Sequence, residues 1–223
     1  MLVRPSVSLV ATATVTTLLI SAAQAGEWPT YRADDHRSGV TAEALAMPLS
    51  PQWTFRPQHG PRRAWPRTFR ENSYTQTKIR SLLTFDHAFQ AVAANGCVYF
   101  GSSADHKVTC LESETGEVRW DYFTEGPIRM APTIAHGRVY VGSDDGFLYC
   151  LDADGGQLIF KHRVGPSGDR LPGNEQWISR WPIRSGVVVR DNVAYCAAGL
   201  FPHREGCFLC GVDAQTGKPL LTE

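Results

Sequence analysis

The sequence predicts an all-β protein made of repeated four-stranded antiparallel sheets. Three observations carry this prediction: a repeat of about forty residues, three turn signals in each copy, and short runs rich in Val, Ala, Ile and Tyr between the turns. Composition permits a packed core, since 43% of the 223 residues are hydrophobic. The 22 basic and 22 acidic side chains cancel, which argues against nucleic acid as the main partner.

The repeat is visible when the chain is compared with itself. The segment GCVYFGSSADHKVTCLESETGEVRWDYFTEGP, beginning at Gly96, aligns with GRVYVGSDDGFLYCLDADGGQLIFKHRVGP, beginning at Gly137. Tyr99 and Tyr140 are 41 positions apart in this alignment. A third copy begins at Trp181 and ends as CGVDAQTGKPLLTE, with extra length near 165–181 and in LFPHREG.

Each copy contains three turns, and these divide it into four strands. The first turns are pairs that tolerate positive φ and suit tight hairpins: Asn95-Gly96, His136-Gly137 and Asp191-Asn192. The second turns lie at residues 103–106, 144–146 and 201–206. The third turns centre on Gly116, Gly156 and Gly217. A forty-residue unit of four strands is typical of a β-propeller blade. A β-sandwich is the alternative, but it gives no reason for the period.

The third turn of each copy resembles Ala-x-Asp-x-x-Thr-Gly-x-x-x-Trp, the docking motif of the quinoprotein-like (PQQ-like repeat) β-propeller family. The matching residues are Glu112, Thr115, Gly116 and Trp120, then Asp152, Gly156 and Phe160, then Asp213, Thr216 and Gly217. Leu221 takes the aromatic position in the third copy, and Cys110, Cys150 and Gly211 take the position of a small residue. The resemblance covers residues 86–221 and extends to the opening GEWPTYRADDHRSG. It implies aromatic side chains packed between neighbouring blades, with about three blades present and the ring incomplete.

Residues 1–25 are expected to be a signal peptide. Arg4 precedes an apolar stretch, and the segment ends in an Ala-x-Ala pattern at Ala25. Cleavage there predicts a periplasmic or secreted protein without a membrane span, and an uncleaved membrane anchor is the alternative.

The remaining chain divides into an N-terminal segment, 26–85, and propeller blades at about 86–126, 127–166 and 181–223. Within the first part, PQWTFRPQHGP around Trp53 resembles the last strand of a blade and is interpreted as a ring-closing strand. Residues 86–223 correspond to roughly 3.4 blades, whereas propellers close with about 4 to 8. We therefore expect an N-terminal fragment of a larger ring, or a chain that needs a partner to cover its open blade faces.

Cysteine and histidine spacing does not predict a metal site. The six cysteines of an exported chain permit disulfides, but Cys207 and Cys210 would point to opposite faces of one strand. The seven histidines show no paired spacing typical of metal ligands. No catalytic residue is assigned.

The candidate site lies on the face that carries the second turns and the connections between blades. Two matching segments there, Pro127-Ile128-Arg129 and Pro182-Ile183-Arg184, place two arginines near the central axis. Such a pair could hold an anionic ligand by bidentate hydrogen bonds, or it could belong to a structural ring of salt bridges. The predicted ligand-binding or partner-binding residues are Arg129, Arg184, Asp144, Asp145, Asp105, His203 and Arg204. The insertion at 165–181, with Trp177, is expected to overhang this face as a loop.

The leading functional hypothesis is a non-catalytic exported scaffold without a cofactor. Its expected partners are protein surfaces, extended peptides or the remainder of the propeller. The alternative is a fragment of a PQQ-dependent periplasmic dehydrogenase, for which the resemblance implies pyrroloquinoline quinone and calcium. The sequence lacks the Cys-Cys dipeptide common in that group. A sugar-binding or polymer-binding module is a third hypothesis.

Overall fold

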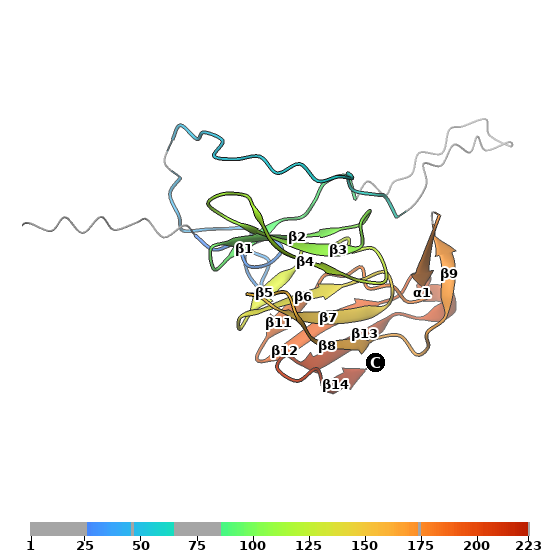
Figure 1. Cartoon of the computed structure of the whole chain (residues 1–223). Coiled ribbons are helices and arrows are strands. Elements are labelled where there is room, and N and C mark those ends of the chain that lie inside the picture. Colours follow the sequence, from blue (N-terminus) through green and yellow to red (C-terminus); the bar gives the residue numbers. More distant parts are fainter. Residues whose placement is uncertain (1–25, 46, 65–85, 174, 223) are drawn as a thin grey trace, which may run out of the picture.

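The computed structural model describes residues 26–45, 47–64, 86–173 and 175–222 (Figure 1). The predicted signal peptide lies outside these residues. Among the residues described, none belongs to a helix long and apolar enough to cross a membrane.

Each of the three repeat copies forms one four-stranded antiparallel sheet in which the strand order follows the chain. We name these sheets blades 1, 2 and 3. Blade 1 consists of β1 (Val92–Ala94), β2 (Cys97–Ser102), β3 (Lys107–Glu112) and β4 (Val118–Phe123). Blade 2 consists of β5 (Thr133–Ala135), β6 (Arg138–Gly142), β7 (Phe147–Asp152) and β8 (Leu158–Arg163). Blade 3 consists of β11 (Val188–Arg190), β12 (Val193–Ala198), β13 (Phe208–Asp213) and β14 (Pro219–Thr222).

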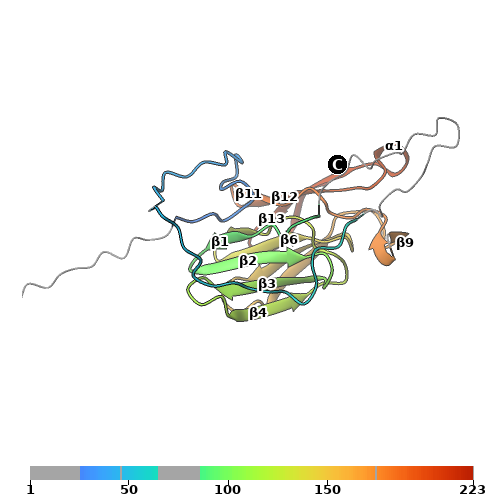
Figure 2. The same ribbon diagram turned by 90° about the horizontal axis from the view of Figure 1, so that it is seen from above.

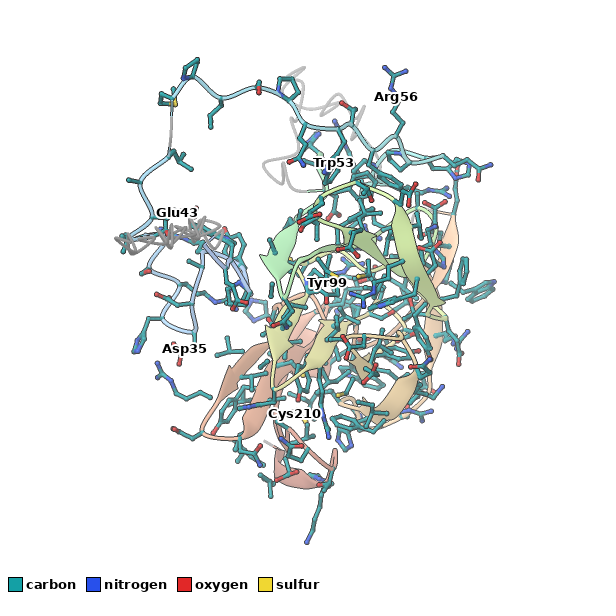
Figure 3. All side chains as sticks on the ribbon, turned by 60° about the vertical axis from the view of Figure 1, so that its left-hand side comes forward. Asp35, Glu43, Trp53, Arg56, Tyr99 and Cys210 are labelled. Atoms are coloured by element: carbon teal, nitrogen blue, oxygen red, sulfur yellow. The ribbon has the colours of Figure 1, made fainter. Side chains whose placement is uncertain are left out.

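The blades pack face to face in chain order, as Figures 1 and 2 show. One core cluster joins blades 1 and 2 through side chains such as Tyr99, Val108 and Tyr149, and Figure 3 labels Tyr99 in this layer. A second cluster joins blades 2 and 3 and contains Tyr140 and Cys196. The core therefore lies between the sheets, as expected for a propeller, and the predicted fold class is confirmed as a partial β-propeller.

Two segments of the loop face differ from the simple turns and loop that we expected. Residues 165–181 contain a two-stranded hairpin, β9 (Arg170–Gly173) and β10 (Gln176–Ser179). The indole of Trp177 on this hairpin is 65% exposed. The turn at 201–206 contains a single-turn helix, α1 (Pro202–Glu205).

The N-terminal segment connects the innermost strands of the blades. Trp28 forms two main-chain hydrogen bonds with Ala93 in β1, at 2.7 and 2.9 Å, and the Pro29 carbonyl accepts one from the amide of Ile134 in β5. The Thr30 hydroxyl lies 2.8 Å from that of Thr133, which in turn donates to the carbonyl of Val187 next to β11. Residues 28–30 thus link blades 1 and 2 directly and reach blade 3 through Thr133.

Candidate functional site

Arg129 lies in a buried ion-pair cluster on the loop face. Its Nε donates to Asp144 Oδ2 at 2.6 Å, and its Nη1 donates to Asp86 Oδ2 and to the Arg62 carbonyl, each at 2.8 Å. The side chains of Arg129, Asp86 and Asp144 are all almost fully buried. Asp144 follows β6, whereas Asp86 comes from the start of blade 1, so the guanidinium joins two blades.

Arg184 joins the same cluster from blade 3. Its Nε and Nη2 donate to the two carboxylate oxygens of Asp144 at 2.8 and 2.7 Å, which is a bidentate pair. Two arginines and two aspartates therefore make the cluster neutral in formal charge. Sequence reasoning left two alternatives open for the arginine pair, and this geometry matches the structural salt bridge. Anion binding by Arg129 and Arg184 stays an untested prediction.

The other predicted acidic residues are also held by neighbouring groups. Asp145 accepts hydrogen bonds from the Tyr149 hydroxyl at 2.7 Å and from the Phe147 amide at 2.9 Å. Burial raises its pKa against the effect of these hydrogen bonds. Asp105 is only partly buried, and although burial acts to raise its pKa, the hydrogen bonds from His59 and Ser102 keep it below the ordinary value.

His203 and Arg204 lie outside this cluster. Both are on the short helix α1 and are exposed. The helix is held through Glu205, whose Oε1 accepts from Arg180 Nε at 2.7 Å. The structure therefore brings Arg129, Arg184 and Asp144 into one cluster, with Asp145 next to Asp144 in the chain. Asp105 instead contacts His59 and Ser102, and His203 and Arg204 lie on α1.

The docking aromatics pack on the glycines of the next blade. Trp120 lies over Gly156, where an added Cβ would be 2.5 Å from its ring, and Phe160 lies over Gly217 at the same distance. Trp120 Nε1 also donates to the carbonyl of Ala153 at 3.0 Å. Because these glycines have φ of 72°, they suit both the turn and the close ring contact.

The acidic and hydroxyl positions of the motif stabilise the same turns. Asp152 Oδ1 accepts from the amides of residues 154 and 155, and Asp213 Oδ1 accepts from the amide and the hydroxyl of Thr216. In the first copy Thr115 accepts from the Glu117 amide, while Glu112 contributes its carbonyl to Gly116. All the motif residues thus have structural contacts in this part of the chain.

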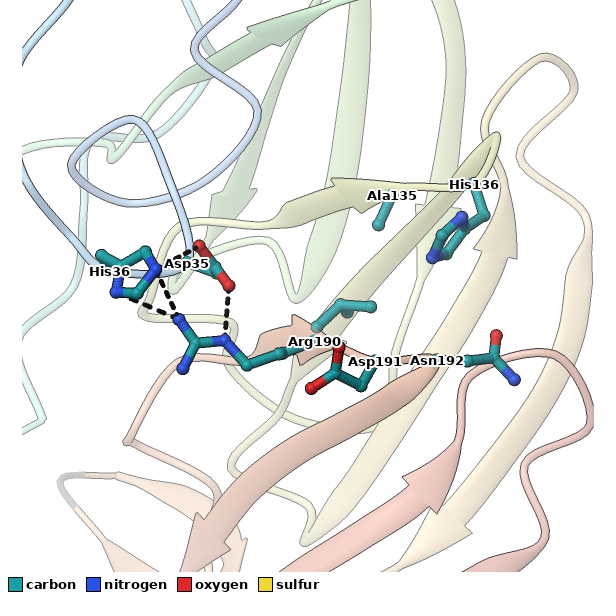
Figure 4. A pocket seen from close by; sticks show the side chains of 8 residues that line it. Asp35, His36, Ala135, His136, Arg190, Asp191 and Asn192 are labelled. Atoms are coloured by element: carbon teal, nitrogen blue, oxygen red, sulfur yellow. Dashed lines mark hydrogen bonds and ion pairs between the residues drawn. The ribbon is translucent and has the colours of Figure 1, made fainter.

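The structure also contains a surface pocket that sequence reasoning missed (Figure 4). The N-terminal segment meets the first turns of blades 2 and 3 there, and Arg190 Nε donates to Asp35 Oδ2 at 2.6 Å. The Arg190 guanidinium also contacts the His36 ring. The hydrogen bond from Arg190 to Asp35 lowers the pKa of the Asp35 carboxyl. The pocket is lined by Asp35, His36, Ala135, His136, Val189, Arg190, Asp191 and Asn192. The sequence carried one signal for this pocket, because the first turns at 136–137 and 191–192 are expected on the same face of neighbouring blades.

The donor groups that the structure describes do not fit a calcium ion or a quinone bound through it. In the described ranges, no group of three or more His, Cys, Asp or Glu side chains could hold a metal ion. The buried carboxylates of Asp86 and Asp144 are already bound by arginines. All six cysteines are free, and Cys110 and Cys150 are fully buried between blades, where small side chains pack.

Comparison with known proteins places these repeats in a family. A family model described as outer membrane protein assembly factor BamB matches residues 51–220. Quinohemoprotein alcohol dehydrogenase ADH IIB of Pseudomonas putida is 26% identical over 131 residues, which cover 49% of this chain and 19% of that protein. The chain therefore spans about a fifth of that relative.

Solved structures show the same fold at low identity. A europium-containing methanol dehydrogenase has a TM-score of 0.51 and 13% identity, covering 88% of this chain and 31% of that chain. The quinohemoprotein alcohol dehydrogenase of Comamonas testosteroni has a TM-score of 0.51 and 19% identity, covering 60% and 20%. Because the family match spans most of the sequence, this chain belongs to the family of the outer membrane protein assembly factor BamB, whose members are PQQ-like repeat β-propellers.

Proposed function

We propose that this chain is an exported, non-catalytic scaffold that binds or assembles proteins. One observation carries the proposal: the far side of blade 3 is built like a blade junction, but its side chains are partly exposed in the part of the chain that the structure describes. We call it the open face of blade 3 and define it by Tyr195, Ala197, Leu209 and Leu221. These residues follow the alternation of strands β12 to β14 and correspond to buried or partly buried positions in blades 1 and 2.

The tyrosines at this repeat position show the difference. Tyr99 and Tyr140 are 1% and 0% exposed, and their hydroxyls donate to the carbonyls of Ala153 and Ala214 in the next blade. Tyr195 is 36% exposed. A large amphipathic ring that is partly free in this way is typical of protein interfaces.

An aliphatic repeat position on the same face shows the same difference in burial. Val108 and Leu148 are fully buried at the two junctions, while Leu209 is 43% exposed. Covering this side chain with a partner would remove apolar surface from water and would favour association. The family description, an assembly factor, is consistent with this use of the fold.

Site-specific photo-crosslinking tests the proposal. A photoreactive residue at Leu209 should trap a partner protein in cells that export the chain, whereas the same residue at exposed Val118 on β4 should trap none. N-terminal sequencing of the exported protein should begin at Gly26. Equal trapping at both positions would contradict the use of the open face.

A fragment of a PQQ-dependent dehydrogenase is the second candidate, favoured by the 26% identity to a quinohemoprotein alcohol dehydrogenase. The purified chain can be mixed with pyrroloquinoline quinone and calcium and assayed for dye reduction with alcohols and sugars. Sustained turnover would overturn the scaffold proposal, and the buried ion pairs of Asp86 and Asp144 lead us to expect none.

A further inference from the structure

We propose that Cys196 and Cys210 are the site of a cross-strand disulfide that closes the hairpin of strands β12 and β13. Both thiols are free in the structure, so the bond requires an oxidant, and a small-molecule disulfide can serve as one. The inference goes beyond the proposed scaffold function and does not depend on it.

The two cysteines stand directly opposite each other in blade 3. Cys196 on β12 pairs with Cys210 on β13, and Figure 3 labels Cys210 in this blade. Both side chains belong to the core cluster between blades 2 and 3 and are 3% and 0% exposed. Opposite residues of a ladder project to the same face, so the two thiols lie side by side. Hydrogen bonding between them raises the pKa of Cys196 and lowers the pKa of Cys210.

The spacing of the two strands suits a disulfide at this pair. The Ala214 amide donates to the Asn192 carbonyl, at a position that continues the same register. Cys196 and Cys210 lie four residues further along each strand. Because hydrogen-bonded pairs alternate along an antiparallel ladder, this is such a pair, with Cα atoms about 5.5 Å apart. Disulfides join Cα atoms about 4.4 to 6.8 Å apart, so the register allows the bond.

The other two blades fill the same repeat position with an aromatic side chain. Phe100 stands opposite Thr109 in blade 1, and Val141 stands opposite Tyr149 in blade 2. Both aromatic rings pack against further rings, at centroid distances of 5.0 Å from Phe89 and 6.0 Å from Tyr122. Blade 3 has two small thiols instead. A covalent bond would hold the two strands together where the other blades have ring contacts.

The hairpin that the bond closes carries a long second turn. Residues 199–207 connect β12 to β13, whereas residues 103–106 and 143–146 make the corresponding connections in blades 1 and 2. A longer loop costs more conformational entropy to close. The cysteines lie two pairs inside the last ladder pair, Ala198 and Phe208. A cross-link there removes much of this entropy from the unfolded chain and so favours the folded hairpin.

No other pair among the six cysteines, all of which the structure describes, has this register. Cys97 lies opposite Glu112 and Cys110 lies opposite Tyr99, so these two cysteines are diagonal neighbours. Diagonal neighbours are about 7 to 8 Å apart, and a Cα separation above about 7 Å prevents a bridge. The Cys97 thiol instead accepts a hydrogen bond from Arg119 Nη1 at 3.1 Å. The diagonal pair is therefore a matched control.

Thiol–disulfide exchange with oxidised glutathione supplies the oxidation. The Cys210 thiolate attacks one sulfur of the glutathione disulfide and releases one glutathione thiolate. The Cys196 thiolate then attacks the Cys210 sulfur of the mixed disulfide and releases the second glutathione. The two cysteines lose two electrons and two protons, and the oxidant becomes two molecules of reduced glutathione. Because both thiols are buried, the exchange takes place during folding or through local opening of the hairpin.

Refolding of the full chain in a mixture of oxidised and reduced glutathione tests the inference. The chain is unfolded in urea with a reductant, diluted into the mixture, blocked with N-ethylmaleimide and digested for peptide mapping by mass spectrometry. The peptides that contain Cys196 and Cys210 should be joined, and those of Cys97 and Cys110 should not. The bond closes a loop of 15 residues, 196–210. The equilibrium constant for unfolding in urea should therefore be at least about tenfold smaller than that of the reduced chain.

Matched substitutions separate this bond from a general effect of the oxidant. Cys196→Ala should remove the joined peptides and the difference in stability between the oxidising and reducing buffers. Cys97→Ala should leave both unchanged. A bridge between Cys97 and Cys110, or unjoined Cys196 and Cys210 after refolding, would overturn the inference, and the parent chain alone decides this if a variant does not fold. Crosslinking at Leu209 reports on the scaffold function independently, so the two failures are distinguishable.

Discussion

The two blade junctions and the open face of blade 3 share one strand pattern. They differ in whether another blade covers the side chains of that pattern. At the junctions a tyrosine hydroxyl meets a carbonyl of the next blade, and at the open face Tyr195 is partly exposed. The strands themselves are alike in length and register. The difference shows that burial at these positions depends on the neighbouring blade, because the strand pattern is the same.

The open face also differs in sequence from the junctions. At Gly101 and Gly142 an added Cβ would lie 2.2 and 2.3 Å from Cγ2 of Ile128 and Ile183, so glycine is needed there. Ala197 holds the same repeat position in blade 3, and its methyl group occupies that space. A partner on the open face therefore cannot insert an isoleucine as blades 2 and 3 do.

Among these variants, the removal of the Asp144 carboxylate should lower the stability of the fold most. A buried ion pair at a blade junction should therefore matter more than an exposed ion pair at the surface. The variant Asp144→Ala leaves two guanidinium groups without their shared carboxylate in a buried site. We expect a loss of about 3 to 5 kcal/mol in the free energy of unfolding, measured by urea denaturation. The exposed pair of Arg190 and Asp35 is the control, and Asp35→Ala should change the free energy of unfolding far less, because water screens this pair. Equal losses would contradict the burial argument.

The docking aromatic gives the next comparison. Trp120→Ala should cost about 3 to 5 kcal/mol, since the indole is 9% exposed and packs on Gly156. Leu221→Ala, at the same position on the open face, should cost about 1 kcal/mol or less. Thermal unfolding measures both, and a near-neutral Trp120 variant would refute docking between blades.

A single hydroxyl sharpens the comparison further. Tyr140→Phe removes a buried donor and leaves the Ala214 carbonyl with one bond fewer, so the expected cost is about 1 to 3 kcal/mol. Tyr195→Phe should stay within about 0.5 kcal/mol of the parent. If both variants lost the same stability, the open face would be covered in solution.

Repetition explains what the sequence could predict. The repeat seen in the spacing of Tyr99 and Tyr140 predicted the four-stranded sheets, and the docking motif predicted the contact of Trp120 with the next blade. The matching segments pointed to Arg129 and Arg184, but no repeated pattern marked Asp86, which shares the Arg129 guanidinium with Asp144. The pocket at Arg190 was missed because Asp35 reaches it from the N-terminal segment, which lies outside the repeat.

Low pH should reduce the stability of the fold through one histidine at each blade junction. We expect this effect to be smaller than those of the substitutions above. His106 lies near Asp144 and Asp145 at the first junction, and burial lowers its pKa, an effect to which Arg129 adds. His162, opposite the buried Leu148, faces the second junction, and burial lowers its pKa as well.

A lowered pKa in the fold means that the unfolded chain binds the proton more tightly, so stability is lost as the pH falls through the unfolded value of about 6.5. The variant His106→Asn keeps a residue that tolerates the local φ of 55°. It should lose less stability than the parent between about pH 8 and about pH 5, with a further reduction when His162→Asn is added. Unfolding by urea at each pH measures this, and parallel pH profiles for parent and variants would show that neither junction responds to acid through these histidines.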